Sequence, residues 1–238
     1  MEEKSLIFHI GPVWFDGTVC LMVLLSCLIV FFTVYFCTRN LQMKPKGKQN
    51  VIEMLIDFVR GIITDNMPRK EVNNFHLLAF TLFMFLLVAN NIGLVTKVVV
   101  GDDITLWKSP TADPIVDLTL ALMMIILTHM FAVKRFGVKG YIVNSFFKPV
   151  AFLAPVKIIE EFTNLLTLAL RLYGNIYAGE VLLTLIANFG SGFGWTIPLA
   201  IPLEMIWLAF SIFISCIQAF IFVTLSMVYM SHKIEVEE

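Results

Sequence analysis

The sequence predicts an all-α integral membrane protein, with five transmembrane helices and one amphipathic helix at the membrane surface. Composition and the spacing of the apolar residues support this prediction. Of the 238 residues, 58% are hydrophobic and only 15% are charged, whereas a soluble domain has roughly a quarter charged residues because water wets its surface. The apolar residues also gather into runs long enough to cross a hydrocarbon core, which takes about 20 residues of helix.

The five expected spans are distributed along the whole chain, and we interpret residues 1–238 as a single membrane domain. The spans are residues 18–38, 75–96, 115–133, 150–187 and 199–230. The last two are longer than a simple crossing, because at 1.5 Å per residue they would measure about 45 to 57 Å against a core of about 30 Å. We therefore expect them to form a long, strongly tilted hairpin.

A segment of a different kind, residues 51–67, follows the first span. Its polar residues recur at helical spacing and share one face, while apolar residues cover the other face. The polar residues are Glu53, Asp57, Arg60 and Thr64. This pattern is typical of an amphipathic helix that lies on a membrane rather than through it. We expect this helix at the cytoplasmic surface.

The distribution of basic residues predicts the orientation. If the first span runs from outside to inside, most Lys and Arg residues fall on the cytoplasmic side, and the outer side receives Lys4, Lys97 and Lys108. Cytoplasmic loops carry such an excess of basic residues. We therefore expect a multi-pass protein of the cell membrane, with its N-terminus outside and its C-terminus in the cytoplasm. Glu2 and Glu3 stand where a secretory signal would be basic, so the first span is expected to remain as an anchor.

Arg171 lies in the middle of the fourth span. A guanidinium near the bilayer centre costs at least about 2.5–3.5 kcal/mol, and its pKa is too high for it to escape by losing a proton. It must therefore meet an anion or a water-filled crevice. A functional role is the default for such a charge, and an internal salt bridge, for instance with Glu180 of a neighbouring chain, is the structural alternative.

Polar side chains approach Arg171 from both sides of the membrane. The inner route consists of Lys157, Glu160, Glu161 and Asn164, which precede the arginine on the fourth span. Asn175 lies one helical turn beyond the arginine. The outer route consists of Glu180 and Glu204, with Asp117 as a further candidate, and Gln218 lies deep on the face of the last span that carries Glu204 and Ser211. Neither route crosses the membrane by itself, and this pattern of intramembrane charges indicates a role in ion transport.

The other polar groups of the spans, and some of those on the two routes, also have a structural interpretation. Asn90, Asn91 and Ser211 could serve only to pair helices. Lys157 and Glu160 could form an interfacial ion pair with no role in transport. His76 and His129 lie near the cytoplasmic ends of their spans and are expected to be structural.

The run NLLTLALRLYGNIYAGE, residues 164–180, resembles the signature helix of the a subunit of the rotary ATP synthase. QAFIF, residues 218–222, resembles the matching segment of that family's last helix. The SPTAD stretch at 109–113 and the amphipathic helix fit as well, so that the resemblance covers essentially the whole chain. KPKGKQNVIEML is similar to the version found in Gram-positive bacteria.

The resemblance implies a stator subunit that translocates protons and works with a c-subunit ring, a b-subunit peripheral stalk and the rest of the complex. In this family a proton enters by an outer half-channel, neutralises a buried carboxylate of the rotating ring, and leaves inward after nearly a full revolution. By position, Arg171 matches the essential arginine that faces this carboxylate and prevents a proton short-circuit. Glu180, Asn175 and Gln218 match positions that line the path or support the arginine.

Two departures from the family concern the outer half-channel. Some members have a histidine where this chain has Ser211, and some carry an aspartate where it reads Gly93, Leu94 and Val95. If those groups relay protons in relatives, the task here passes to Glu204, water or Asp117. Sodium in place of protons is not decided by this chain, because the ligands would belong to the c ring.

Other function classes fit the sequence less well. A stand-alone secondary transporter is the main alternative, but it would show inverted repeats, and we find no symmetry between the two halves of the chain. A purely structural anchor would not retain several membrane-buried charges. The sequence contains no phosphate-binding loop, no nucleic-acid motif and no set of metal ligands. We therefore expect no cofactor and no catalytic activity outside the complex.

Overall fold

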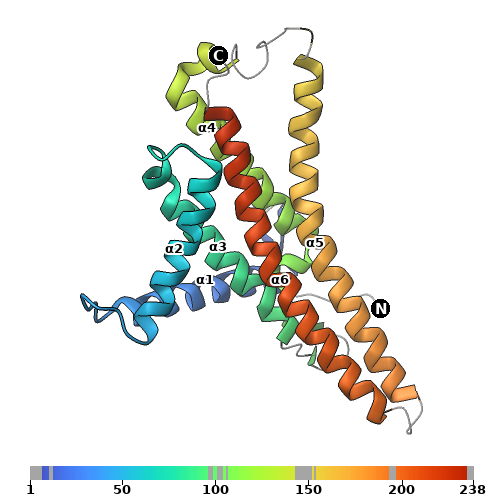
Figure 1. The fold of residues 1–238 in the computed structure, drawn as a ribbon. Coiled ribbons are helices and arrows are strands. Elements are labelled where there is room, and N and C mark those ends of the chain that lie inside the picture. The colour runs from blue at the N-terminus through green and yellow to red at the C-terminus, as the bar shows by residue number, and fades with distance from the viewer. Residues whose placement is uncertain are drawn as a thin grey trace.

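The computed structural model describes residues 7–10, 13–95, 99–100, 104–105, 107–142, 152, 154–192 and 197–234 (Figure 1). Helices dominate these residues. They are α1 (Gly17–Thr38), α2 (Lys48–Asn66), α3 (Val72–Val95), α4 (Pro114–Ile142), α5 (Ala154–Gly192) and α6 (Ile197–Ile234), with a short 3-10 helix, η1 (Pro110–Ala112), before α4. The prediction of a helical membrane protein is confirmed.

Two short antiparallel strand pairs depart from the all-α prediction. β1 (Ile7–Ile10) pairs with β2 (Val13–Asp16), and β3 (Val99–Val100) pairs with β4 (Ile104–Thr105). Both are local hairpins of β-branched and aromatic residues outside the long helical runs. At the end of the first pair, the Asp16 carboxylate accepts the backbone N–H of Thr18 at 2.9 Å and so caps α1.

Four of the described helices are long and apolar enough to cross a membrane, rather than the five that the sequence predicted. They are Gly17–Thr38, Val72–Gly93, Pro114–Tyr141 and Pro198–Ile234. The expected fourth span, α5, does not reach the same hydropathy, because Lys157, Glu160, Glu161, Arg171 and Glu180 interrupt it. A fifth crossing therefore stays a prediction.

The helices α5 and α6 form a long antiparallel pair, against which the rest of the bundle packs (Figure 1). α3 contacts α6, α4 contacts both helices of the pair, and α2 lies against α3 and α6. The core between them is apolar, and its largest fully buried side chains include Leu86, Met124, Leu168, Leu172, Phe222 and Met227. Burial of this surface holds the pair and its neighbours in a fixed register.

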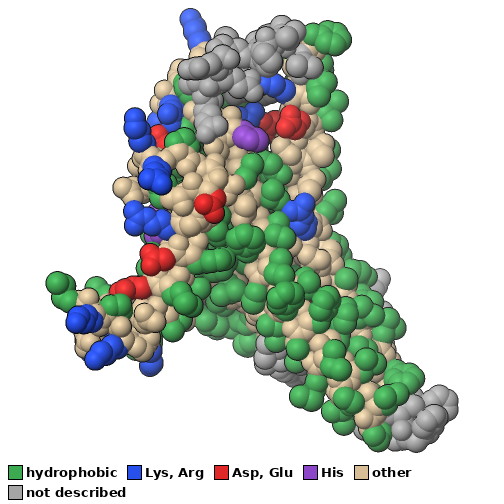
Figure 2. Space-filling model, in the orientation of Figure 1, with side chains coloured by type: hydrophobic (Ala, Val, Ile, Leu, Met, Phe, Trp, Pro, Cys, Tyr) green, Lys and Arg blue, Asp and Glu red, His purple; other side chains and the backbone are tan. Residues whose placement is uncertain are grey.

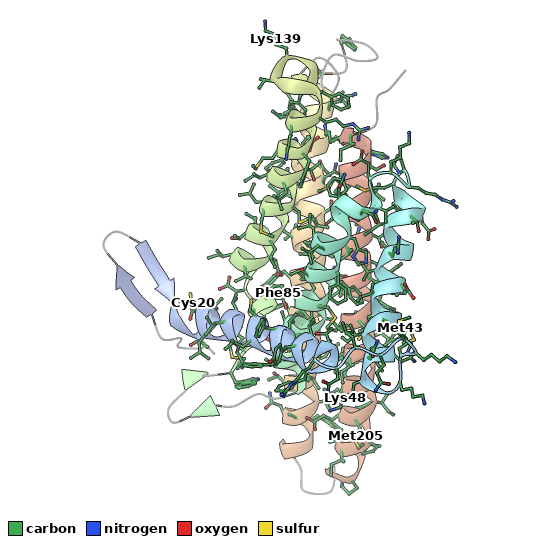
Figure 3. All side chains as sticks on the ribbon, turned by 90° about the vertical axis from the view of Figure 1, so that its left-hand side faces the viewer. Cys20, Met43, Lys48, Phe85, Lys139 and Met205 are labelled. Carbon is green, nitrogen blue, oxygen red and sulfur yellow. The ribbon has the colours of Figure 1, made fainter. Side chains whose placement is uncertain are left out.

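The first two helices differ in direction and in surface. α1 runs across the long axis of the α5–α6 pair in both Figure 1 and Figure 3, whereas α2 runs beside α6 in both views. α1 exposes large apolar side chains such as Phe31 and Phe36. On α2, Val59 and Ile63 are fully buried while Arg60 is exposed, as expected for an amphipathic helix.

The loop before α4 folds back onto the end of α3. The Trp107 indole N–H donates to the Ile92 carbonyl at 2.9 Å, and the Ser109 hydroxyl donates to the Ala89 carbonyl at 2.8 Å. Gly93 permits this approach, because a Cβ there would stand 2.2 Å from the Ser109 backbone nitrogen. The loop thereby brings η1 into contact with α5.

Candidate functional site around Arg171

The register of the α5–α6 pair is fixed by contacts along its length. Near the middle, the Asn175 side-chain N–H donates to the Gln218 amide oxygen at 2.8 Å. Further out, the Trp207 indole N–H donates to the Gly179 carbonyl at 3.2 Å. Near the tip, Gly190 allows a close approach of α6, since a Cβ there would lie 2.8 Å from the Cβ of Ala200.

Arg171 lies on α5 one turn before the Asn175–Gln218 hydrogen bond, and it is half-buried. Among the residues that the structure describes, no carboxylate forms an ion pair with its guanidinium. The phenol of Tyr229 on α6 lies within electrostatic range of both Arg171 and Glu160. The guanidinium is therefore not neutralised by a described carboxylate of its own chain.

The surface of α5 next to Arg171 carries exposed apolar side chains and an exposed glycine. Leu170 is 58% exposed and Tyr177 is 52% exposed. Gly174 is exposed and has open space where a side chain would stand. Figure 2 shows hydrophobic side chains covering much of the lower part of the α5–α6 pair. A permanent charge thus lies at the edge of a surface suited to lipid or to another helix.

Of the inner-route residues, Glu161 is tied into a network that joins three helices. It forms an ion pair with Lys233 of α6 and lies 3.8 Å from the His129 Nε2 of α4. The Tyr141 hydroxyl is 2.7 Å from the other ring nitrogen of His129. Glu160 is exposed beside this network. Glu161 therefore contributes to packing between helices, whatever else it does.

Asn164 is half-buried and Lys157 is half-buried on the same stretch of α5. Both precede Arg171 along the helix, on the side where Glu160 and Glu161 lie. The residues of the predicted inner route therefore lie along one stretch near the start of α5.

The outer-route residues lie on the other side of the arginine along α5, and on α6. Glu180 is half-buried on α5, about 14 Å from Arg171 along the helix axis. Glu204 is exposed on α6, about 21 Å along the axis from Gln218. Ser211, which lies between Glu204 and Gln218 in the sequence, is only 7% exposed. The structure brings Asn175 and Gln218 together beside Arg171, but it does not bring Glu204 to the same place.

A family model described as the ATP synthase A chain matches residues 20–231. Relatives from Enterococcus hirae and Enterococcus faecalis are each 75% identical over the full length of both chains. A relative from Listeria monocytogenes is 50% identical over the full length of both chains. All three carry the name ATP synthase subunit a.

The chain belongs to the ATP synthase A chain family. This membership confirms the resemblance that residues 164–180 and 218–222 indicated, and it makes the chain a component of the membrane sector of ATP synthase. Its relatives come from Gram-positive genera, in agreement with the resemblance of residues 44–55. ATP synthesis and ion transport are therefore the setting in which the geometry around Arg171 is interpreted.

Sequence reasoning missed one residue of this A chain site. Tyr229 is close enough to Arg171 and Glu160 to affect their electrostatic environment. It lies eleven residues after Gln218, which is close to three helical turns and places both side chains on one face of α6. Following the helix face of Gln218 for three more turns along the sequence would have identified Tyr229.

Proposed function

We propose that this chain is the proton-translocating stator subunit of ATP synthase, with two offset half-channels that lead to the buried carboxylates of a rotating c ring. One observation carries the proposal. Arg171 is a half-exposed permanent charge on the apolar face of a long helix pair, beside the Asn175–Gln218 hydrogen bond. A charge in that setting is suited to meet a carboxylate supplied by another chain.

The directions of the helices support a strongly tilted hairpin. α1 has 22 residues and would be about 33 Å long, which matches a bilayer core of about 30 Å if it stands upright. α5 has 39 residues and α6 has 38, so each would be about 57 to 59 Å long. Because α1 runs across their axis (Figures 1 and 3), an upright α1 leaves α5 and α6 strongly inclined.

This placement completes the proposed topology. The chain crosses the membrane five times, with α5 as a crossing whose charges are accommodated by water and by the c ring. The N-terminus lies outside and the C-terminus in the cytoplasm, in keeping with the positive-inside rule. The polar face of α2 meets the cytoplasmic surface of the membrane.

Arg171 would act as a fixed positive charge that each ring carboxylate must pass. A nearby guanidinium favours the deprotonated form of a carboxylate, so the proton leaves toward the inner half-channel. The guanidinium itself keeps its protons, and so offers no relay between the two half-channels. Its planar fork also allows contact with a carboxylate over a range of positions.

The two half-channels would lie at opposite ends of the arginine helix. Glu160, Glu161 and Asn164 serve the cytoplasmic exit, while Glu180 and Glu204 serve the outer entry. Along the axis of α5, Glu160 lies about 16 Å from Arg171 on one side, and Glu180 lies about 14 Å from it on the other. Because the two carboxylates are too far apart to exchange a proton directly, the proton must be carried from one half-channel to the other by a carboxylate of the c ring.

Membership of the family supports the partners. The c ring would pack against the exposed face of α5 that carries Leu170 and Gly174, and the b-subunit peripheral stalk would hold the chain still against rotation. The transported ion is a proton, unless the ligands of the c ring select sodium. No cofactor takes part in this role, and the chemistry of ATP resides in other subunits of the complex.

The test replaces Arg171 in the whole complex reconstituted in liposomes. Under an imposed pH gradient and membrane potential, Arg171→Ala should abolish ATP formation while the complex stays assembled. Arg171→Lys should not restore it, because a buried lysine releases its proton far more readily than arginine. Arg60→Ala, which removes an exposed arginine of α2, is the matched control and should synthesise ATP normally. Near wild-type synthesis by Arg171→Ala would overturn the proposal.

A further inference from the structure

Asp117 is a buried carboxyl group to which the proposed function assigns no task. It lies near the start of α4, its exposed fraction is 0%, and its two carboxylate oxygens have no hydrogen-bond partner among the residues that the structure describes. Burying such a group is costly unless it gains a proton, a cation or water. Unsatisfied buried polar groups of this kind are rare in native proteins and call for an explanation.

Two contacts fix the register between α4 and α5. Ala112, at the end of η1, packs against Ile176 of α5. Farther along α4, His129 lies 3.8 Å from Glu161. Higher numbers on α4 therefore pair with lower numbers on α5, and the two helices are antiparallel.

This register places Asp117 at the level of Arg171. Counting twelve residues back along α4 from His129 and twelve forward along α5 from Glu161 brings Asp117 to about residue 173 of α5. The contact of Ala112 with Ile176, five residues before Asp117, agrees with this level. At that level Leu172 is fully buried, whereas Arg171 is half-exposed. Asp117 therefore lies inside the bundle, while the arginine lies at its edge.

Other polar atoms with no partner lie in the same core. The hydroxyls of Ser211 and Ser215 are buried on the face of α6 that carries Gln218, and no described residue pairs with them. α6 packs against α4. Buried polar atoms of this kind usually bind internal water. Internal water is the simplest way to satisfy Asp117 and these two hydroxyls.

The charges near Asp117 are few. Asp113, just before the start of α4 and four residues ahead of Asp117, is within electrostatic range. On α5 the charged residue of the same level is Arg171. The buried residues of α6 that carry polar groups here, Ser211, Ser215 and Gln218, are not ionisable.

We propose that Asp117 is a proton-relay residue of the outer half-channel, which passes protons through the bundle interior to the level of Arg171. The inference deepens the proposed function and rests on it. A hydronium ion from the outer side gives its proton to the Asp117 carboxylate, which forms an O–H bond and leaves water. The acid then gives that proton to a water molecule on the ring side and becomes a carboxylate again.

The test measures ATP-driven proton pumping by the whole complex in inverted membrane vesicles. Asp117→Asn keeps the shape of the side chain but cannot relay a proton, and should pump at least about tenfold more slowly. Asp117→Glu keeps the carboxyl group and should pump faster than Asp117→Asn. Asp65→Asn, which removes an exposed carboxylate of α2, should pump normally. Wild-type pumping by Asp117→Asn would overturn the proposal, as would equal loss in Asp117→Asn and Asp117→Glu.

Infrared spectroscopy gives a readout that a purely structural role would not move. The wild-type complex should show the C=O stretch of a buried protonated carboxyl group that shifts in heavy water, and Asp117→Asn should lack this band. An unchanged band in Asp117→Asn would contradict a proton on Asp117 even if that variant assembled poorly. If Arg171→Ala uncouples the complex while Asp117→Asn pumps normally, only this inference fails. If Arg171→Ala stays coupled, the half-channel function itself fails.

Discussion

Arg171 owes its partial exposure to its position on α5. Leu168 and Leu172, on either side of it in sequence, are almost fully buried, whereas Leu170 is 58% exposed. At 100° per residue, Arg171 therefore falls at the border between the core and the outer surface. Its aliphatic stem can lie along apolar neighbours while the guanidinium reaches outward. Sequence alone identified this residue, because a permanent charge amid apolar residues needs no structure to stand out.

The hydrogen bond between Asn175 and Gln218 should position Arg171 by fixing α6 against α5. Asn175→Leu and Gln218→Leu should each slow ATP-driven pumping, because each leaves the partner amide unpaired. The double variant should cost much less than the product of the two single losses, since both remove one interaction. Pumping rates of the four proteins in vesicles give this cycle, and losses that multiply would show that the two amides act separately.

At the scale of elements, the loop that carries η1 packs tightly against the end of α3. Sequence analysis noted that some relatives have an aspartate near Gly93, but it gave no reason for glycine here. The structure supplies one, because the Ser109 backbone occupies the space of a side chain. Such a contact joins residues that are far apart in sequence, and local patterns do not encode it.

Gly93→Ala should therefore destabilise the protein, by about 1–3 kcal/mol if the loop is forced to shift. Gly61→Ala is the matched control, since Gly61 lies within α2 and has open space around it. That change should be neutral or stabilising by up to about 1 kcal/mol, because alanine favours a helix. Thermal unfolding of the purified complex in detergent compares the two. Equal stability of both variants would show that the loop yields without cost.

The halves of α5 and α6 between the Asn175–Gln218 hydrogen bond and the segment that joins the two helices each carry one carboxylate, Glu180 and Glu204. If they guide protons inward, Glu180→Gln and Glu204→Gln should each slow ATP-driven pumping without loss of assembled complex. The larger effect is expected for Glu180, which is half-buried, because Glu204 is exposed and water can stand in for it. Vesicle acidification and native gels measure the two quantities. Wild-type pumping by the double variant would assign both residues a structural role.

At the scale of the whole molecule, periodicity and hydropathy predicted the helical class, the amphipathic face of α2 and the long final pair. They did not predict β1 and β2, which are short and lie outside the apolar runs. Nor did they predict the network in which Glu161 pairs with Lys233 and lies near His129, because it joins three helices. Face patterns show which residues share one helix surface, but not which helix that surface meets.

The central claim is that Arg171 separates two half-channels, so that protons cross only by way of the ring. The most direct measurement is passive proton conductance of assembled wild-type and Arg171→Ala complexes in liposomes under a membrane potential, without nucleotide. Each proton that leaks through 100 mV dissipates about 2.3 kcal/mol, so an intact complex should conduct little. Conductance should rise clearly in Arg171→Ala and should not rise in Arg60→Ala. Equal conductance in wild type and Arg171→Ala would contradict it.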